Sequence, residues 1–130
     1  MRVGGNHPLT APAATAHRVL CRLADIGDPG GRGFSLGEGR DDILVIRRGR
    51  QVWGYVNHCP HAGTPLDWAP DVFLTVDRTL IQCATHGARF RIEDGHCAGG
   101  PCHGKPLVAV PVAIVDENVA LLNLGPFRGL

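Results

Sequence analysis

The stretch ILVIRRGRQVWGYVNHCPHAGTPL, residues 43–66, decides the fold. Its first part predicts a β-hairpin, because an apolar ILVI run meets an Arg- and Gly-containing bend and residues 52–57 then alternate in character. The second predicted strand runs directly into Cys59-Pro60-His61. Two side chains that commonly bind metals therefore follow the end of a strand.

The segments on either side of this hairpin also have strand character. No 12-residue stretch carries a convincing helical stripe, and residues 25–42 are so dense in turn formers that we expect a long surface loop there. The prediction is an all-β fold, a small antiparallel sandwich or barrel of roughly eight to ten strands. The further strands are expected in HRVLCRL (17–23, an edge strand), FLTVDRTLIQ (73–82, a hairpin bent at Asp77-Arg78), ARFRIED (88–94) and LVAVPVAIVDENVALLNL (107–124, a hairpin bent at 116–118).

Composition limits the classes of function. The 130 residues suffice for one domain, and we expect a flexible N-terminal arm over 1–16 and a single domain over 17–130. Lys and Arg number 13 against 12 Asp and Glu, so no strong field attracts nucleic acid or an anionic membrane. Five cysteines and an N-terminus without a secretory pattern predict a reducing, cytoplasmic location.

Two Cys/His pairs occupy corresponding positions in two predicted hairpins. Cys59 and His61 follow one strand, and Cys83 and His86 follow another. A thiolate and an imidazole two or three residues apart on one loop can bind the same metal centre, and two such loops supply four ligands. A structural Cys2His2 zinc site is the alternative, although zinc sites usually pair Cys with Cys and His with His.

The motifs CPHAGTPL (59–66), CATHGARF (83–90) and DGHCAGGPCHGKPL (94–107) resemble those of the soluble Rieske-type [2Fe-2S] ferredoxins. The resemblance covers roughly residues 17–124 and implies a Rieske-type sandwich or barrel with a cluster-binding subdomain of two loops. It also implies one [2Fe-2S] cluster per chain, with Cys59 and Cys83 on one iron and His61 and His86 on the other. The Gly100-Pro101 segment would be a covering loop.

Cys97 and Cys102 lie in this covering segment, with histidines beside them. The family pattern assigns no ligand to the segment, so we expect two thiols there. A second metal site and a redox-dependent disulfide between the two cysteines are the alternatives.

The resemblance implies an electron carrier between a flavin- or NAD(P)H-dependent reductase and a terminal oxygenase. We expect no catalysis, because the sequence lacks a mononuclear-iron ligand set, a nucleotide-binding glycine fingerprint and a plausible triad. The alternatives are a Rieske-like small subunit of an oxidoreductase complex, such as assimilatory nitrite reductase, and a redox sensor. High-potential relatives are expected to carry hydroxyls where this chain has Ala88 and Phe90, which predicts a low reduction potential.

Overall fold

The computed structural model describes residues 17–36, 42–59, 66, 71–83, 87–100 and 105–122. The fold is all-β, as predicted, while the expected arm over residues 1–16 lies outside the described ranges. No helix within those ranges is long and apolar enough to span a bilayer. The described elements are β1 (His17–Arg22), the 3-10 helix η1 (Leu23–Asp25), β2 (Gly30–Phe34), β3 (Ile43–Arg48), β4 (Gln51–Val56), β5 (Leu80–Gln82), β6 (Arg89–Arg91), β7 (Cys97–Gly99), β8 (Ala109–Val110), β9 (Val112–Val115) and β10 (Asn118–Leu122).

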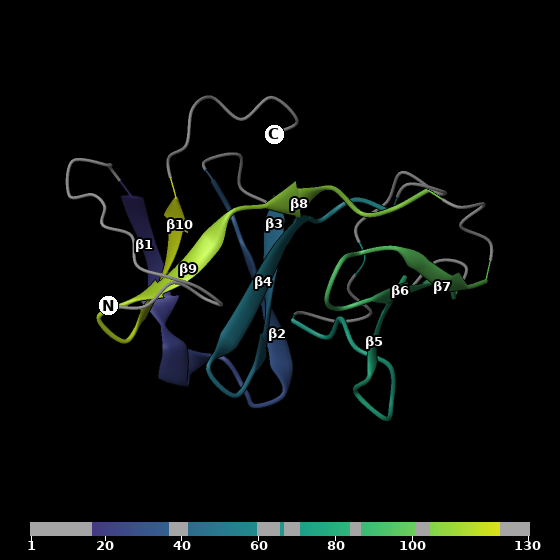
Figure 1. Cartoon of the computed structure of the whole chain (residues 1–130), viewed down its shortest axis with the longest axis horizontal. Helices are drawn as coiled ribbons and strands as arrows, with labels where there is room; N and C mark the ends of the chain where they lie inside the picture. The colour runs from purple at the N-terminus through teal and green to yellow at the C-terminus, as the bar shows by residue number, and fades with distance from the viewer. Residues whose placement is uncertain are drawn as a thin grey trace.

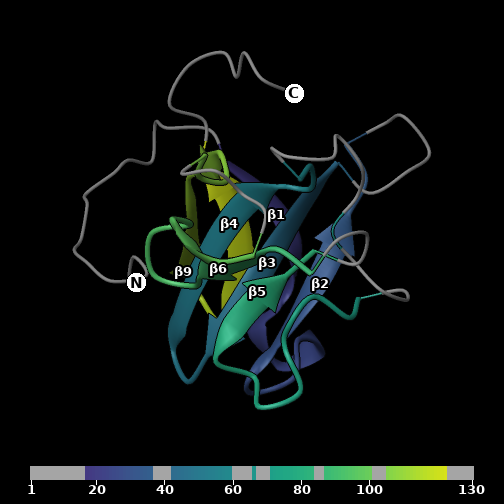
Figure 2. The same cartoon turned by 90° about the vertical axis from the view of Figure 1, so that its right-hand side faces the viewer.

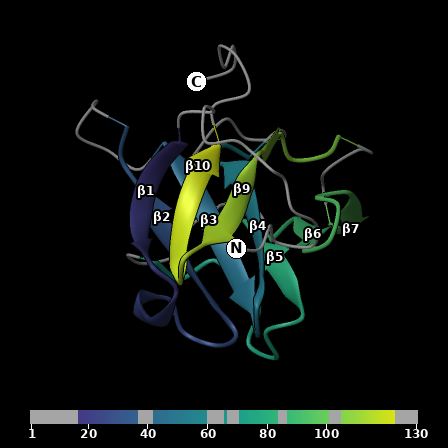
Figure 3. The same ribbon diagram turned by 60° about the vertical axis from the view of Figure 1, so that its left-hand side comes forward.

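These strands form three antiparallel sheets. The terminal sheet has the order β1-β10-β9, the central sheet β2-β3-β4-β8 and the distal sheet β5-β6-β7. Figure 1 shows the terminal and distal sheets on opposite sides of the central one, and Figure 3 brings the terminal sheet forward. In Figure 2 the distal sheet lies in front of β3 and β4.

The central sheet is apolar on both faces, which explains the unbroken ILVI run. Ile43 and Val45 pack into a core shared with the terminal sheet. Leu44 and Ile46 alternate with them and pack into a second core that contains residues of the distal sheet. Successive side chains of a strand point to opposite faces, so a strand between two layers has no solvent-facing position that would favour polar residues.

The predicted hairpins are confirmed. The β3–β4 hairpin turns at Gly49, whose φ is +64°. The β9–β10 hairpin turns at Asp116 and Glu117, with φ values of +51° and +67°, as expected for a tight turn that matches the strand twist. In the 73–82 segment, the antiparallel bridge between Leu74 and Ile81 places the bend at the expected position.

The prediction of a long surface loop over 25–42 is wrong, because β2 lies inside it and pairs with β3 over five residues. Its glycines serve close packing as well as turning. A Cβ atom on Gly31 would lie 2.8 Å from Cδ1 of Ile46. The glycine-rich strand β2 therefore packs closely against a bulky side chain of β3. Because glycines replace the apolar side chains of a usual strand, the sequence shows no apolar/polar alternation that would predict it.

Candidate metal centre

The first predicted ligand loop leaves β4 and turns into the core. The backbone N–H of Asn57 donates to the Asp42 carbonyl at 3.0 Å, and the N–H of His58 donates to the Val56 carbonyl at 2.8 Å. These bonds end the strand in a tight turn. Cys59 follows and is fully buried.

The second ligand loop is closed by its own backbone. Cys83 follows β5; its N–H donates to the Ala88 carbonyl at 2.8 Å, and its carbonyl accepts the Gly87 N–H at 3.0 Å. Gly87 adopts a φ of +74°, a left-handed conformation that favours glycine at this return. Cys83 is fully buried.

The structure brings Cys59 and Cys83 into one core although 24 positions separate them in the sequence. Both are thiols and neither is in a disulfide. His61 and His86 lie outside the described residues. Within the described part of the chain, no three potential metal-ligating side chains gather at one point.

The donor chemistry of this core fits an iron–sulfur cluster. Thiolates are the ligands that hold such clusters, and here two thiols from separate loops lie among apolar side chains such as Leu66 and Phe90. A buried thiolate without a cation is costly, so a metal centre would compensate for its desolvation. Cys59 and Cys83 are therefore suited to the sulfur-ligated end of a buried cluster.

Directly after strand β7, the backbone at Gly100 packs closely against the second ligand loop. A Cβ atom on Gly100 would lie 2.9 Å from both the Ala88 Cα and the Gly87 carbonyl oxygen, and Gly100 has a φ of +80°. Both constraints require glycine at this position. The start of the expected covering segment thus lies against the second ligand loop, while Pro101 is outside the described residues.

The expectation that Cys97 is a thiol is wrong, because Cys97 is in a disulfide. A disulfide sulfur is not a thiolate, so Cys97 is unsuited to a second metal site. Cys97 lies on β7, which ends at Gly99, and Gly100 follows in a left-handed conformation with a φ of +80°. Cys102 and His103 lie outside the described residues.

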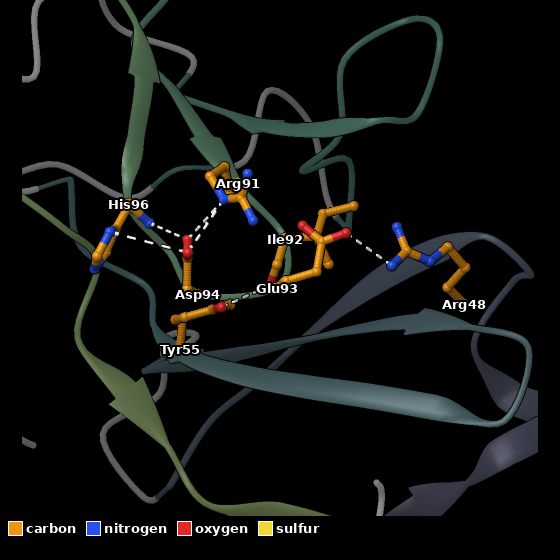
Figure 4. A network of polar contacts seen from close by, with 7 residues as sticks. All are labelled: Arg48, Tyr55, Arg91, Ile92, Glu93, Asp94 and His96. Carbon is orange, nitrogen blue, oxygen red and sulfur yellow. Dashed lines mark hydrogen bonds and ion pairs between the residues drawn. The ribbon is translucent and has the colours of Figure 1, made fainter.

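A polar network, drawn in Figure 4, fastens the β6–β7 turn to the central sheet. The Tyr55 hydroxyl on β4 donates to the Ile92 carbonyl at 2.6 Å, and Arg48 on β3 forms an ion pair with Glu93 at 2.8 Å. Burial, together with the nearby charges of Asp94 and Glu93, raises the pKa of Tyr55 well above its usual value. The neutral hydroxyl is therefore the favoured form.

One buried polar side chain beside the first ligand loop was not predicted from the sequence. Asn57 is 8% exposed, and its Oδ1 accepts a hydrogen bond from the Leu66 N–H at 2.7 Å. The available signal was weak. A polar residue ends the alternating strand two positions before Cys59, and strand ends commonly carry asparagine as a solvated turn residue.

Comparisons with family models and with solved structures point to one family. The family model described as the Rieske [2Fe-2S] domain matches residues 18–121. Among solved structures, a Sphingomonas yanoikuyae B1 ferredoxin is 25% identical, with 83% of this chain and 99% of that chain covered and a TM-score of 0.67. Among curated protein sequences no significant match is found.

Two further solved structures share the fold. One is the ferredoxin of carbazole 1,9a-dioxygenase from Nocardioides aromaticivorans IC177, 23% identical, with 82% of this chain and 96% of that chain covered and a TM-score of 0.66. The other is a complex of reduced oxygenase and oxidized ferredoxin in carbazole 1,9a-dioxygenase, 22% identical, with coverages of 86% and 97% and a TM-score of 0.68.

The all-β fold and the buried cysteine pair fit an iron–sulfur protein. The family match over most of its length places the chain in the Rieske [2Fe-2S] domain family. Its cofactor is accordingly a [2Fe-2S] cluster.

Proposed function

We propose that this chain is a Rieske-type ferredoxin that accepts one electron from a flavin- or NAD(P)H-dependent reductase and delivers it to a terminal oxygenase. Support for the carrier role comes from the Rieske family match and the ferredoxin similarities, whose chains are almost fully covered. The similar complex of an oxygenase with its ferredoxin motivates the choice of acceptor. The cluster supplies one-electron redox chemistry.

The proposed ligands are Cys59, Cys83, His61 and His86. The observation that carries this proposal is the joint burial of Cys59 and Cys83, as thiols, in one core. Each histidine follows its cysteine by two or three residues in the sequence. Two neutral imidazoles in place of two thiolates leave the oxidised centre less negative, so accepting an electron costs less free energy.

The residues of the two ligand loops are suited to docking. No Asp, Glu, Lys or Arg occurs within 59–66 or 83–88. A partner surface could approach these segments without desolvating a charge, which is a favourable condition for short-lived complexes. Rapid electron delivery needs this kind of contact, because each carrier must dissociate before it is reduced again.

A reductive titration tests the carrier role. The purified holoprotein should take up one electron per chain and release it fully on reoxidation. Mixed anaerobically in its reduced form with a Rieske oxygenase from the same cells, it should be reoxidised within the turnover time of that oxygenase. The Cys83→Ser variant is the control and should deliver no electrons.

The opposite results would contradict the proposal. The first such result is a holoprotein that is not reversibly reduced in the titration. The second is a native protein that elutes in gel filtration only as part of a large flavin-containing complex. A fixed subunit of such a complex cannot shuttle between a reductase and an oxygenase.

A further inference from the structure

Apart from Tyr55, with its buried hydroxyl, Asn57 is the one buried residue with a polar side chain among the described residues. A buried amide group is costly unless its polar atoms are bonded. The Oδ1 atom accepts the backbone N–H of Leu66 at 2.7 Å, which is a short and therefore well-made bond. The side chain thus has a definite local task.

The bond joins the two ends of the first ligand loop. Asn57 lies two residues before Cys59, and Leu66 lies five residues after His61. On one side, the Asn57 backbone is fixed to the central sheet through the Asp42 carbonyl at 3.0 Å. On the other side, Leu66 is fully buried in the same core as Cys59.

A hydrogen bond across the neck of a loop restricts the residues next to it, and here those residues include Cys59. A segment with fixed ends and a hydrogen-bonded neck has less conformational freedom than one anchored at a single end. The ligands of a metal centre need such restriction, because the surrounding residues orient them and tune their bonding.

We propose that Asn57 is a positioning residue for the [2Fe-2S] cluster: its carboxamide ties Leu66 to the end of β4 and so holds Cys59 in place for the iron that it would bind. This inference rests on the proposed function, because it takes Cys59 as a ligand. It assigns to Asn57 a role in retaining the cluster that differs from general stabilisation of the fold.

The chemistry of the side chain explains the choice of asparagine. A leucine has nearly the same size but offers no acceptor, so the Leu66 N–H would remain buried without its bond. An aspartate keeps the acceptor but adds a negative charge close to the proposed centre. Asparagine combines a strong acceptor with neutrality.

The test uses the holoprotein with Asn57→Leu and Asn57→Asp. Asp28→Ala is the matched control, because Asp28 Oδ1 accepts the Gly49 N–H at 2.8 Å at the opposite end of β4. Three properties are measured: the rate of iron release to a chelator, the midpoint potential and the EPR signal of the reduced protein. Thermal unfolding reports general stability.

We expect Asn57→Leu to release iron about tenfold faster or more than the wild type, with a broadened EPR signal. Asn57→Asp should retain iron as the wild type does, but at a lower midpoint potential, because a nearby negative charge disfavours electron uptake. Asp28→Ala should lower only the unfolding temperature.

Iron release from Asn57→Leu at the wild-type rate would overturn the proposal, and so would markedly faster iron release from Asn57→Asp than from the wild type, because aspartate keeps the acceptor for the Leu66 N–H. The second result decides the question even if Asn57→Leu fails to fold. A wild-type chain that assembles no cluster would instead contradict the proposed function itself.

Discussion

Ala88 and Phe90 are the residues through which the protein core could set the reduction potential. Both are fully buried in the core that contains Cys59 and Cys83, and the Ala88 carbonyl accepts the Cys83 N–H at 2.8 Å. Neither side chain has a hydroxyl. Hydrogen bonds to a charged group are worth about 1.5–3 kcal/mol, and such bonds to cluster or cysteine sulfur would stabilise the reduced state.

We therefore predict a midpoint potential at the low end of the Rieske range of about −150 to +300 mV. Ala88→Ser and Phe90→Tyr should each raise it, by on the order of 100 mV, since about 1.4 kcal/mol corresponds to about 59 mV for one electron. Voltammetry near neutral pH measures both. A wild-type midpoint well above 0 mV would contradict the prediction and weaken the oxygenase-partner proposal.

At the scale of residues, sequence alone predicted that Cys59 and Cys83 occupy corresponding loops, because the spacing of each Cys/His pair is a local property; the structure brings the two cysteines into one core, and their role as ligands stays a prediction. It did not predict the carboxamide of Asn57 bonded to Leu66, and it gave a disulfide at Cys97 only as an alternative to two thiols. The first depends on where the chain returns after nine residues, which the loop sequence does not encode in a periodic pattern. The second depends on which sulfur the fold brings to Cys97, and spacing along the chain does not show it.

At the scale of elements, the β6–β7 turn depends on Tyr55, the only tyrosine in the chain. Its raised pKa means that the folded protein favours the neutral phenol. The unfolded chain ionises near pH 10, so this stabilisation is present below about pH 10 and is lost as pH rises further.

We predict that the free energy of unfolding of the wild type decreases above about pH 10 as Tyr55 of the unfolded chain ionises. The Tyr55→Phe variant should not show this contribution to the pH dependence. At neutral pH, Tyr55→Phe should be less stable by about 1 kcal/mol, because the buried Ile92 carbonyl loses its donor. Denaturant unfolding between pH 7 and 11 checks the stability, and tyrosinate absorbance checks the titration. A tyrosine that ionises near pH 10 in the folded protein would refute the prediction.

The elements themselves were predicted wherever side chains alternate or meet a turn former, as in the β3–β4 and β9–β10 hairpins. The strand β2 was not, because its GGRGF sequence pairs through the backbone and carries almost no side-chain pattern. Long-range pairing of a glycine-rich strand depends on the neighbouring strand β3, which supplies the packing surface.

At the scale of the whole molecule, charge is balanced both overall and locally. The formal net charge is +1, and several surface arginines are paired with acids, as in the Arg48–Glu93 contact at 2.8 Å and the Arg50–Glu117 contact at 2.8 Å. The proposed docking loops carry no charged side chain. Long-range steering should therefore contribute little to association with a partner.

We predict that the rate of electron delivery to the partner oxygenase changes by only a few fold between low and high ionic strength. Stopped-flow measurements over a salt series test this, with the intrinsic midpoint potential measured at each salt concentration as a control. A fall of about a hundredfold would show that charges outside the two loops guide the encounter.

The central claim is that two cysteines and two histidines of this chain hold a [2Fe-2S] cluster. Pulsed EPR of the reduced protein, prepared with isotope-labelled histidine, tests it most directly. The account predicts two histidine-nitrogen couplings in the wild type, with two iron atoms per chain, and no cluster in the His61→Ala and His86→Ala variants. An EPR-silent protein that contains zinc, or a cluster without histidine coupling, would contradict it.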